Sequence, residues 1–165
     1  MQVRKLTTLA LYTTLAMIIF AVECCIPPLV PIPGIKLGLA NIITLVVLIK
    51  YSPRDTLLIL LARIFLSTFL FGQAMSLLYS LVGGLCCLAA MVPLNRLLHN
   101  HYIYLTSIIG ALCHNLGQLL VAFLLTAVPG VLTYLPFLIL SGILTGLFTG
   151  LCAHFALQYL SRHLS

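Results

Sequence analysis

The chain has 165 residues, of which 62% are hydrophobic and only 6% are charged, and its formal net charge is +6. Soluble domains carry about 25% charged residues, so this composition excludes a water-soluble protein. The basic residues are scattered singly rather than clustered, which excludes a nucleic-acid-binding surface. We therefore expect an all-α, polytopic membrane protein with a single integral membrane domain over residues 1–165.

Six apolar stretches with short loops use nearly the whole chain, and each is expected to form a membrane-spanning helix. Most basic residues at the helix ends fall on one side of this arrangement, and Lys36 falls on the other. The positive-inside rule then places both termini in the cytoplasm. The first stretch has no signal-peptide cleavage site, so it is expected to remain in the protein as the first span. The expected spans are 6–26, 35–50, 55–71, 74–95, 104–128 and 132–160.

The second stretch follows a proline-rich segment that ends in Pro-Gly, and Lys36 lies just inside it. A helix N-terminus has unpaired N–H groups, which together with a lysine can bind a phosphate or carboxylate. The alternative is a lysine that anchors the helix end at the lipid headgroups. Asn41 lies about 7.5 Å deeper along the helix and is either a ligand contact or an interhelical hydrogen-bonding residue.

The third stretch contains Arg63 near its middle. A charge at the bilayer centre costs roughly 2.5–3.5 kcal/mol on insertion scales, so such residues face the bundle interior, pair, or line a site. Arg63 either pairs with Glu23, binds an anionic ligand, or extends its side chain to the interface. Gln73 lies in the outer turn after this stretch, on the same side as Lys36.

The fifth stretch contains the motif "HNLGQ", with His114, Asn115 and Gln118 close together in an apolar segment. His114 and Gln118 are four residues apart and share a helix face, and Asn115 and Gln118 are three apart. Three polar residues within five positions indicate a buried network or the wall of a binding site.

The sixth stretch contains "SGILTGLFTG", in which Gly142, Gly146 and Gly150 recur every four residues. Glycines at this spacing line one helix face and allow a neighbouring helix to approach closely. We interpret them as helix-packing residues, with partner docking or a pore-lining role as the alternatives.

The chain has two acidic residues, Glu23 and Asp55, and Asp55 is expected to cap the third helix. Carboxylate-dyad hydrolysis and magnesium-diphosphate chemistry both need convergent acids, and nucleotide hydrolysis needs a phosphate-binding loop. The cysteines lack zinc-site spacing. We expect no enzyme activity, no metal and no cofactor, so powered transport would need another subunit.

Four motifs in this order, "PGIKLGLANIITL", "LLARIFLSTFLFG", "HNLGQLLVA" and "YLPFLILSGILTGLFTG", resemble the bacterial Gx transporter family over about residues 27–152. That family is also labelled heptaprenyl diphosphate synthase component I. It is similar to the substrate-binding (S) components of energy-coupling factor (ECF) transporters, which are six-helix proteins of the bacterial cytoplasmic (inner) membrane.

The resemblance implies an ECF S-component-like six-transmembrane-helix bundle that works with an ECF transmembrane subunit and its ATPases. It implies a ligand site in the outward half, beneath the segment 27–35, with contacts from Lys36, Asn41, Arg63 and Gln73. The first helix departs from the usual docking pattern, because it has Ala10 with Thr14 where S components commonly have two alanines.

We therefore expect a membrane subunit, embedded in lipid, that captures a small anionic metabolite from the outer side, such as a vitamin, a cofactor or an isoprenoid or quinone precursor. The expected substrate-binding residues are Lys36, Asn41, Arg63, Gln73, His114, Asn115 and Gln118. The alternative is a non-catalytic membrane accessory of a soluble heptaprenyl diphosphate synthase in menaquinone side-chain biosynthesis. A third interpretation is a purely structural membrane subunit.

Overall fold

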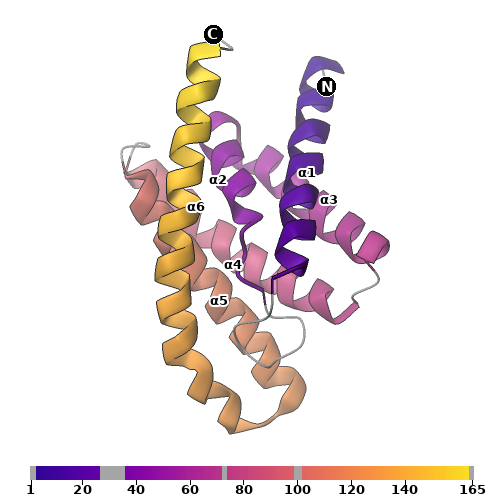
Figure 1. The fold of residues 1–165 in the computed structure, drawn as a ribbon, viewed down its shortest axis with the longest axis vertical. Helices are drawn as coiled ribbons and strands as arrows, with labels where there is room; N and C mark the ends of the chain where they lie inside the picture. The colour runs from indigo at the N-terminus through magenta and orange to yellow at the C-terminus, as the bar shows by residue number, and fades with distance from the viewer. Residues whose placement is uncertain (1–2, 27–35, 72–73, 99–101, 164–165) are drawn as a thin grey trace.

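The computed structural model describes residues 3–26, 36–71, 74–98 and 102–163 (Figure 1). In these ranges the chain forms helices and turns and no strand, which confirms the all-α class. The helices are α1 (Val3–Cys24), α2 (Asn41–Lys50), α3 (Pro53–Phe71), α4 (Ala74–Leu97), α5 (Ile103–Thr126), the 3₁₀-helix η1 (Pro129–Tyr134) and α6 (Leu135–His163).

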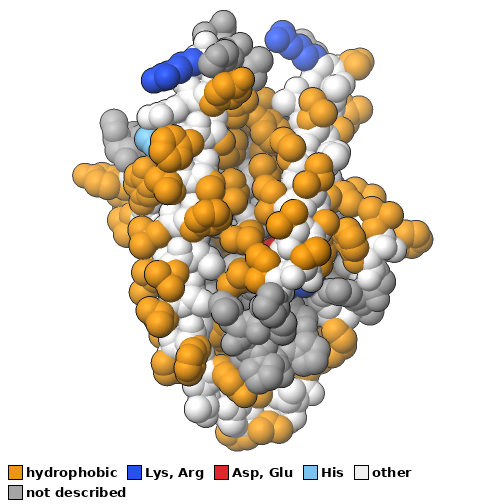
Figure 2. All heavy atoms as spheres, in the orientation of Figure 1, with side chains coloured by type: hydrophobic (Ala, Val, Ile, Leu, Met, Phe, Trp, Pro, Cys, Tyr) orange, Lys and Arg blue, Asp and Glu red, His pale blue; other side chains and the backbone are white. Residues whose placement is uncertain are grey.

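Four of these helices, α1, α4, α5 and α6, are long and apolar enough to cross a membrane. Figure 2 shows hydrophobic side chains over the sides of the bundle and Lys and Arg side chains at one end. Large apolar residues such as Phe69 and Phe137 project outward, which a bilayer accommodates and water does not. The chain is therefore a membrane helical bundle, with the start of α1 and the end of α6 at the same end (Figure 1).

Helix α2 has only ten residues, but it is buried on nearly every side. Its segment Leu45–Leu48 is fully apolar and packs against Leu60 and Ile64 of α3 and Met91 of α4. A helix that is hydrophobic all round is stable when it lies inside a protein rather than at its surface. The sequence of α2 thus places it at the centre of the bundle.

Helix α5 packs closely against both α4 and α6. At the crossing with α4, a Cβ atom built on Gly117 would lie 2.9 Å from the Cα of Gly83. That distance is too short for any side chain, so glycines at both positions allow the two backbones to meet. This close crossing positions His114 and Gln118 of α5 beside the inner helices.

The start of α2 differs from the expected start of its span, because the helix begins at Asn41, six residues after position 35. Gly38 has a φ of +79°, which interrupts a right-handed helix. Helix α3 begins at Pro53, two residues before its expected start, and Ser52 rather than Asp55 occupies the cap position. Asp55 N–H donates to Ser52 Oγ at 3.3 Å, and Ser52 Oγ donates to Asp55 Oδ2 at 2.8 Å.

Candidate functional site

A cluster of buried polar side chains lies where α1, α2, α3 and α5 meet. Its members come from four helices but share near-complete burial, at 4% exposure or less: Glu23, Asn41, Arg63, His114 and Gln118. Four of these five are predicted site residues, and the structure brings them together. Buried polar groups need partners, so their hydrogen bonds define what the cluster can do.

The cluster holds a non-helical segment, residues 36–40, inside the bundle. Glu23 Oε1 accepts a hydrogen bond from the Gly38 N–H. The Gln118 carboxamide, oriented to match its neighbours, donates to the Lys36 carbonyl oxygen at 2.9 Å and accepts from the Lys36 N–H at 3.3 Å. His114 Nε2 donates to the same Gln118 oxygen at 3.1 Å. Irregular backbone at membrane depth is thus satisfied by side chains from α1 and α5.

Gly38 cannot be replaced by a larger residue without moving its neighbours. Besides its positive φ, a Cβ atom at this position would lie 2.9 Å from Asn41 Nδ2 and 2.9 Å from His114 Cδ2. The backbone of the 36–40 segment therefore passes directly against the side chains of α2 and α5. Only glycine gives this close approach.

The Lys36 side chain turns toward the end of α1. Its Nζ donates to Cys24 Sγ at 2.9 Å and lies 3.8 Å from the centroid of the Phe20 ring, which is a cation–π contact. The expected anion site at a helix N-terminus beside Lys36 is wrong in one respect. Helix α2 starts later, and the N–H groups of Asn41, Ile42 and Ile43 bond to the carbonyl groups of residues 38–40.

Arg63 projects from α3 into the cluster, and its charge is not matched by a direct ion pair. Nε and Nη2 are buried and have no hydrogen-bond partner among the described residues. Glu23 lies within electrostatic range of Arg63, but the described structure contains no ion pair between them. The ion pair that the described residues do form lies outside this cluster, between Asp55 Oδ1 and Lys5 Nζ at 2.8 Å. Arg63 thus presents one edge of its guanidinium to the interior without a protein acceptor.

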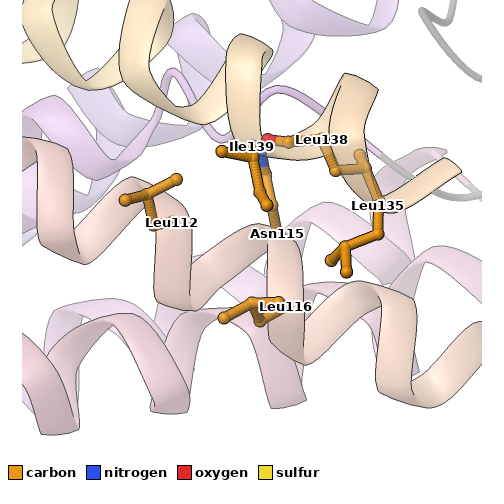
Figure 3. Close-up of a pocket in the computed structure, with 6 residues that line it drawn as sticks. All are labelled: Leu112, Asn115, Leu116, Leu135, Leu138 and Ile139. Atoms are coloured by element: carbon orange, nitrogen blue, oxygen red, sulfur yellow. Dashed lines mark hydrogen bonds between the residues drawn. The ribbon is translucent and has the colours of Figure 1, made fainter. Parts of the chain in front are cut away.

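Asn115 lies apart from this cluster, because consecutive residues on a helix point about 100° apart. Its Nδ2 donates to the carbonyl oxygen of Leu138 on α6 at 2.8 Å (Figure 3). It also donates to Ser141 Oγ, on the same helix, at 3.2 Å. The side chain joins α5 to α6 beside an apolar cavity of about 270 Å³. Besides Asn115, the residues that line this cavity are Leu112, Leu116, Leu135, Leu138 and Ile139.

The three glycines of α6 face α5, as the four-residue spacing predicts. A Cβ atom on Gly142 would lie 3.0 Å from a Leu112 side-chain atom, one on Gly146 2.6 Å from the Ile108 Cα, and one on Gly150 3.1 Å from Ser107 Cβ. Close helix packing is therefore what these residues provide. Ser107 Oγ and Thr149 Oγ1 share a hydrogen bond of 2.7 Å at the same interface.

Two expectations fall on residues outside the described ranges: the contact from Gln73 and the covering segment 27–35. Sequence reasoning also missed two members of the site. Glu23 is predicted only as an alternative partner for Arg63, and Gly38 is not among the predicted site residues. Two features of the sequence indicate these residues: Glu23 is an acid near the end of an apolar helix, and Gly38 is a glycine between Lys36 and Asn41. Within the described ranges, no three His, Cys, Asp or Glu side chains converge as a metal site.

In a comparison with protein families, the family described as heptaprenyl diphosphate synthase component I matches residues 12–156. The match covers most of the chain and includes all five residues of the buried cluster. No curated protein and no solved structure matches the chain.

Proposed function

Since the chain belongs to the heptaprenyl diphosphate synthase component I family, as the match over residues 12–156 shows, we propose that it is a non-catalytic membrane subunit that binds a small anionic metabolite. In this proposal it resides in the bacterial cytoplasmic membrane and captures its ligand from the outer side, in the manner of an ECF S component. One observation carries the proposal: the buried guanidinium of Arg63 has donors that meet no protein acceptor in the described structure.

An uncompensated cation inside a membrane protein is costly, and such residues usually mark ligand or ion pathways. Nε–H and one Nη2–H lie along the same edge of the guanidinium, so they match two oxygens of one carboxylate or phosphate. The chain has few acids that could take this role, since Asp55 pairs with Lys5 and Glu23 accepts from Gly38. A bound anion would satisfy the free edge of Arg63.

The orientation of the site supports capture from outside. Lys and Arg side chains gather at the end where α1 begins and α6 ends (Figure 2). The positive-inside rule assigns that end to the cytoplasm. Glu23, near the end of α1, and the 36–40 segment before α2 then lie toward the outer half. Because the cluster is buried, entry of a ligand requires movement of this segment.

The test is to purify the protein and identify co-purified small molecules by mass spectrometry. Wild-type protein is expected to carry an anionic metabolite, and Arg63→Ala and Lys36→Ala are expected to reduce or lose it. Arg96→Ala is the matched control, since it removes an exposed arginine in the last turn of α4. An empty wild-type protein, or equal ligand in all variants, would refute the anion site.

The family description favours a second candidate, a non-catalytic accessory of a prenyl diphosphate synthase. Such a subunit would bind a soluble synthase at its cytoplasmic end rather than ECF ATPases. Co-purification from bacterial membranes separates the two functions. Recovery of an ECF transmembrane subunit with its ATPases supports transport, and recovery of a soluble prenyl synthase supports the accessory role.

A further inference from the structure

We propose that the groove between α1 and α3 binds one hydrocarbon chain of a phospholipid whose anionic headgroup lies at the basic end of the bundle. The basic end is the end where α1 begins and α6 ends, at which Lys and Arg side chains gather (Figure 2). This inference concerns a different surface from the cluster around Arg63 and does not depend on the function proposed above.

The groove has the depth of one leaflet of a bilayer. Its lining on α1 runs from Leu6 to Met17, and its lining on α3 runs from Leu58 to Leu66. The eleven residues from Leu6 to Met17 (17 − 6) advance about 16 Å along a helix, at about 1.5 Å per residue. The hydrocarbon core of a bilayer is about 30 Å thick, so one leaflet contributes about 15 Å. A chain that enters from the basic end would therefore fill the groove along its length.

The width of the groove favours a hydrocarbon chain over a helix. Its volume is about 480 Å³, which over a length of about 16 Å gives a mean cross-section of about 30 Å². A helix with its side chains is about 10–12 Å across, so its cross-section is roughly 80–110 Å². The groove is too narrow to hold a helix, whereas an extended hydrocarbon chain is only one methylene wide.

The walls of the groove suit an apolar occupant. Thr13 and Thr14 are the polar residues among those that line it. Their hydroxyl groups donate to the carbonyl oxygens of Leu9 and Ala10, at 2.9 Å and 3.0 Å, so both hydroxyl protons are already bonded. A polar occupant would give up its bonds to water without replacement, which is unfavourable. A hydrocarbon chain has no such cost.

The charges at the basic end of the groove complement an anionic headgroup. Lys5, next to Leu6, pairs with Asp55 at 2.8 Å, and its side chain remains 42% exposed. Arg4 and Arg54 are exposed and adjoin the two members of this ion pair in the chain. Basic residues at the membrane surface attract anionic lipids, and an arginine can bind two phosphate oxygens at once. A zwitterionic headgroup would bring its own cation to this basic surface.

The test measures lipid binding to the full-length, lipid-depleted protein in detergent micelles by native mass spectrometry. The probes are phosphatidylglycerol and phosphatidylcholine with the same two acyl chains, so that only the headgroup differs. We expect phosphatidylglycerol to bind at least about tenfold more tightly, since each basic residue at the surface contributes about fivefold. The double variant Arg4→Gln with Arg54→Gln is expected to lose this preference. Arg96→Gln with Arg162→Gln is the control, because these exposed arginines lie on α4 and α6.

A second pair of variants tests the groove itself. Ala10 lines the groove and is exposed, so Ala10→Phe would fill the groove without placing the ring in the core. We expect it to weaken the binding of both lipids at least about tenfold, because the chain loses its place. Ala89→Phe is the control at an exposed alanine of α4 outside the groove. Leu58→Trp fills the groove from the opposite wall and serves if Ala10→Phe does not fold.

The outcomes decide between a bound lipid and other occupants. Equal affinity for the two lipids in wild type, or wild-type affinity in both groove-filling variants, overturns the inference. Photo-methionine at Met17, which lines the groove, identifies the occupant in bacterial membranes. A photocrosslink from this residue to phosphatidylglycerol supports the inference, and a crosslink to a second polypeptide overturns it.

Discussion

Gln118 on α5 binds both backbone hydrogen-bonding groups of Lys36, donating to its carbonyl oxygen at 2.9 Å and accepting from its N–H at 3.3 Å. One carboxamide thus replaces the pairing that a helix or sheet would give this residue. These bonds fix a segment that precedes α2 to a residue of α5 that lies 82 positions later in the chain (118 − 36). They also hold the Lys36 side chain where it reaches Cys24 and Phe20.

Gln118→Ala is therefore expected to loosen the 36–40 segment. The two Lys36 backbone groups would lose their partner, and an unsatisfied buried group costs about 1–3 kcal/mol. Cys24, half-buried and bonded to Lys36 Nζ, is expected to react faster with a maleimide, measured by peptide mass spectrometry. Gln158→Ala is the control, because Gln158 lies on α6 and bonds to His154. Equal Cys24 labelling rates in wild type and Gln118→Ala would contradict this role.

The double variant Arg63→Met with Glu23→Gln tests whether the buried charges are retained for binding rather than for stability. Replacing buried charges with apolar or neutral groups of similar size is often neutral or stabilising by about 1–4 kcal/mol. Glutamine keeps an oxygen for the Gly38 N–H. Without added ligand, we expect the double variant to melt at or above the wild-type temperature.

The anion identified by co-purification, when added, is expected to raise the melting temperature of wild type and not of the double variant, since only wild type binds it. Melting can be followed by intrinsic tyrosine fluorescence in detergent micelles. A large loss of stability in the unliganded double variant would show instead that Glu23 and Arg63 hold the fold together.

The sequence predicts those features that depend on local spacing or on the cost of burial. The α6 glycines recur every four residues, close to one helical turn, so the sequence alone predicts that they share one helix face. The structure places that face against α5. Arg63 is predicted to face inward because a lipid-exposed position is too costly. Asp55 is predicted to lie at the start of α3, and the structure pairs it there with Ser52, three residues earlier.

Other features depend on residues far apart in sequence, and spacing does not reveal them. Helix α2 starts at Asn41 because Glu23 and Gln118, from other helices, bind the backbone before it. His114 and Asn115 are adjacent in "HNLGQ", yet the first faces the buried cluster and the second faces α6. The motif predicts a polar patch, but only helix packing divides it between two interfaces.

Asn115→Ala is expected to reduce stability and leave anion binding unchanged. It removes the bonds to the Leu138 carbonyl oxygen and to Ser141 Oγ, and such interhelical bonds are worth about 0.6 to 1.7 kcal/mol in membrane proteins. Melting temperature measures the first effect, and titration with the co-purified anion measures the second. If the variant lost anion binding while its melting temperature stayed at the wild-type value, Asn115 would belong to the ligand site.

Gly146→Ala is expected to disrupt the α5–α6 interface. Its new Cβ would lie 2.6 Å from the Ile108 Cα and 3.1 Å from the Ile108 backbone nitrogen. Because these are backbone atoms, no rotamer change relieves the contact, and the helices must separate. Overpacking of this kind typically costs about 1–3 kcal/mol. Circular dichroism melting in micelles is expected to show a clear drop in melting temperature.

Gly130→Ala provides the matched control for this interface. At this exposed position of η1, its new Cβ would meet only Val128 Cγ1, at an ordinary distance of 3.6 Å. We expect a melting temperature close to that of wild type. If Gly146→Ala also melted like wild type, α6 would not need its glycine face for packing against α5. The four-residue glycine repeat would then be available for the other role that the sequence allows, which is docking of a partner helix.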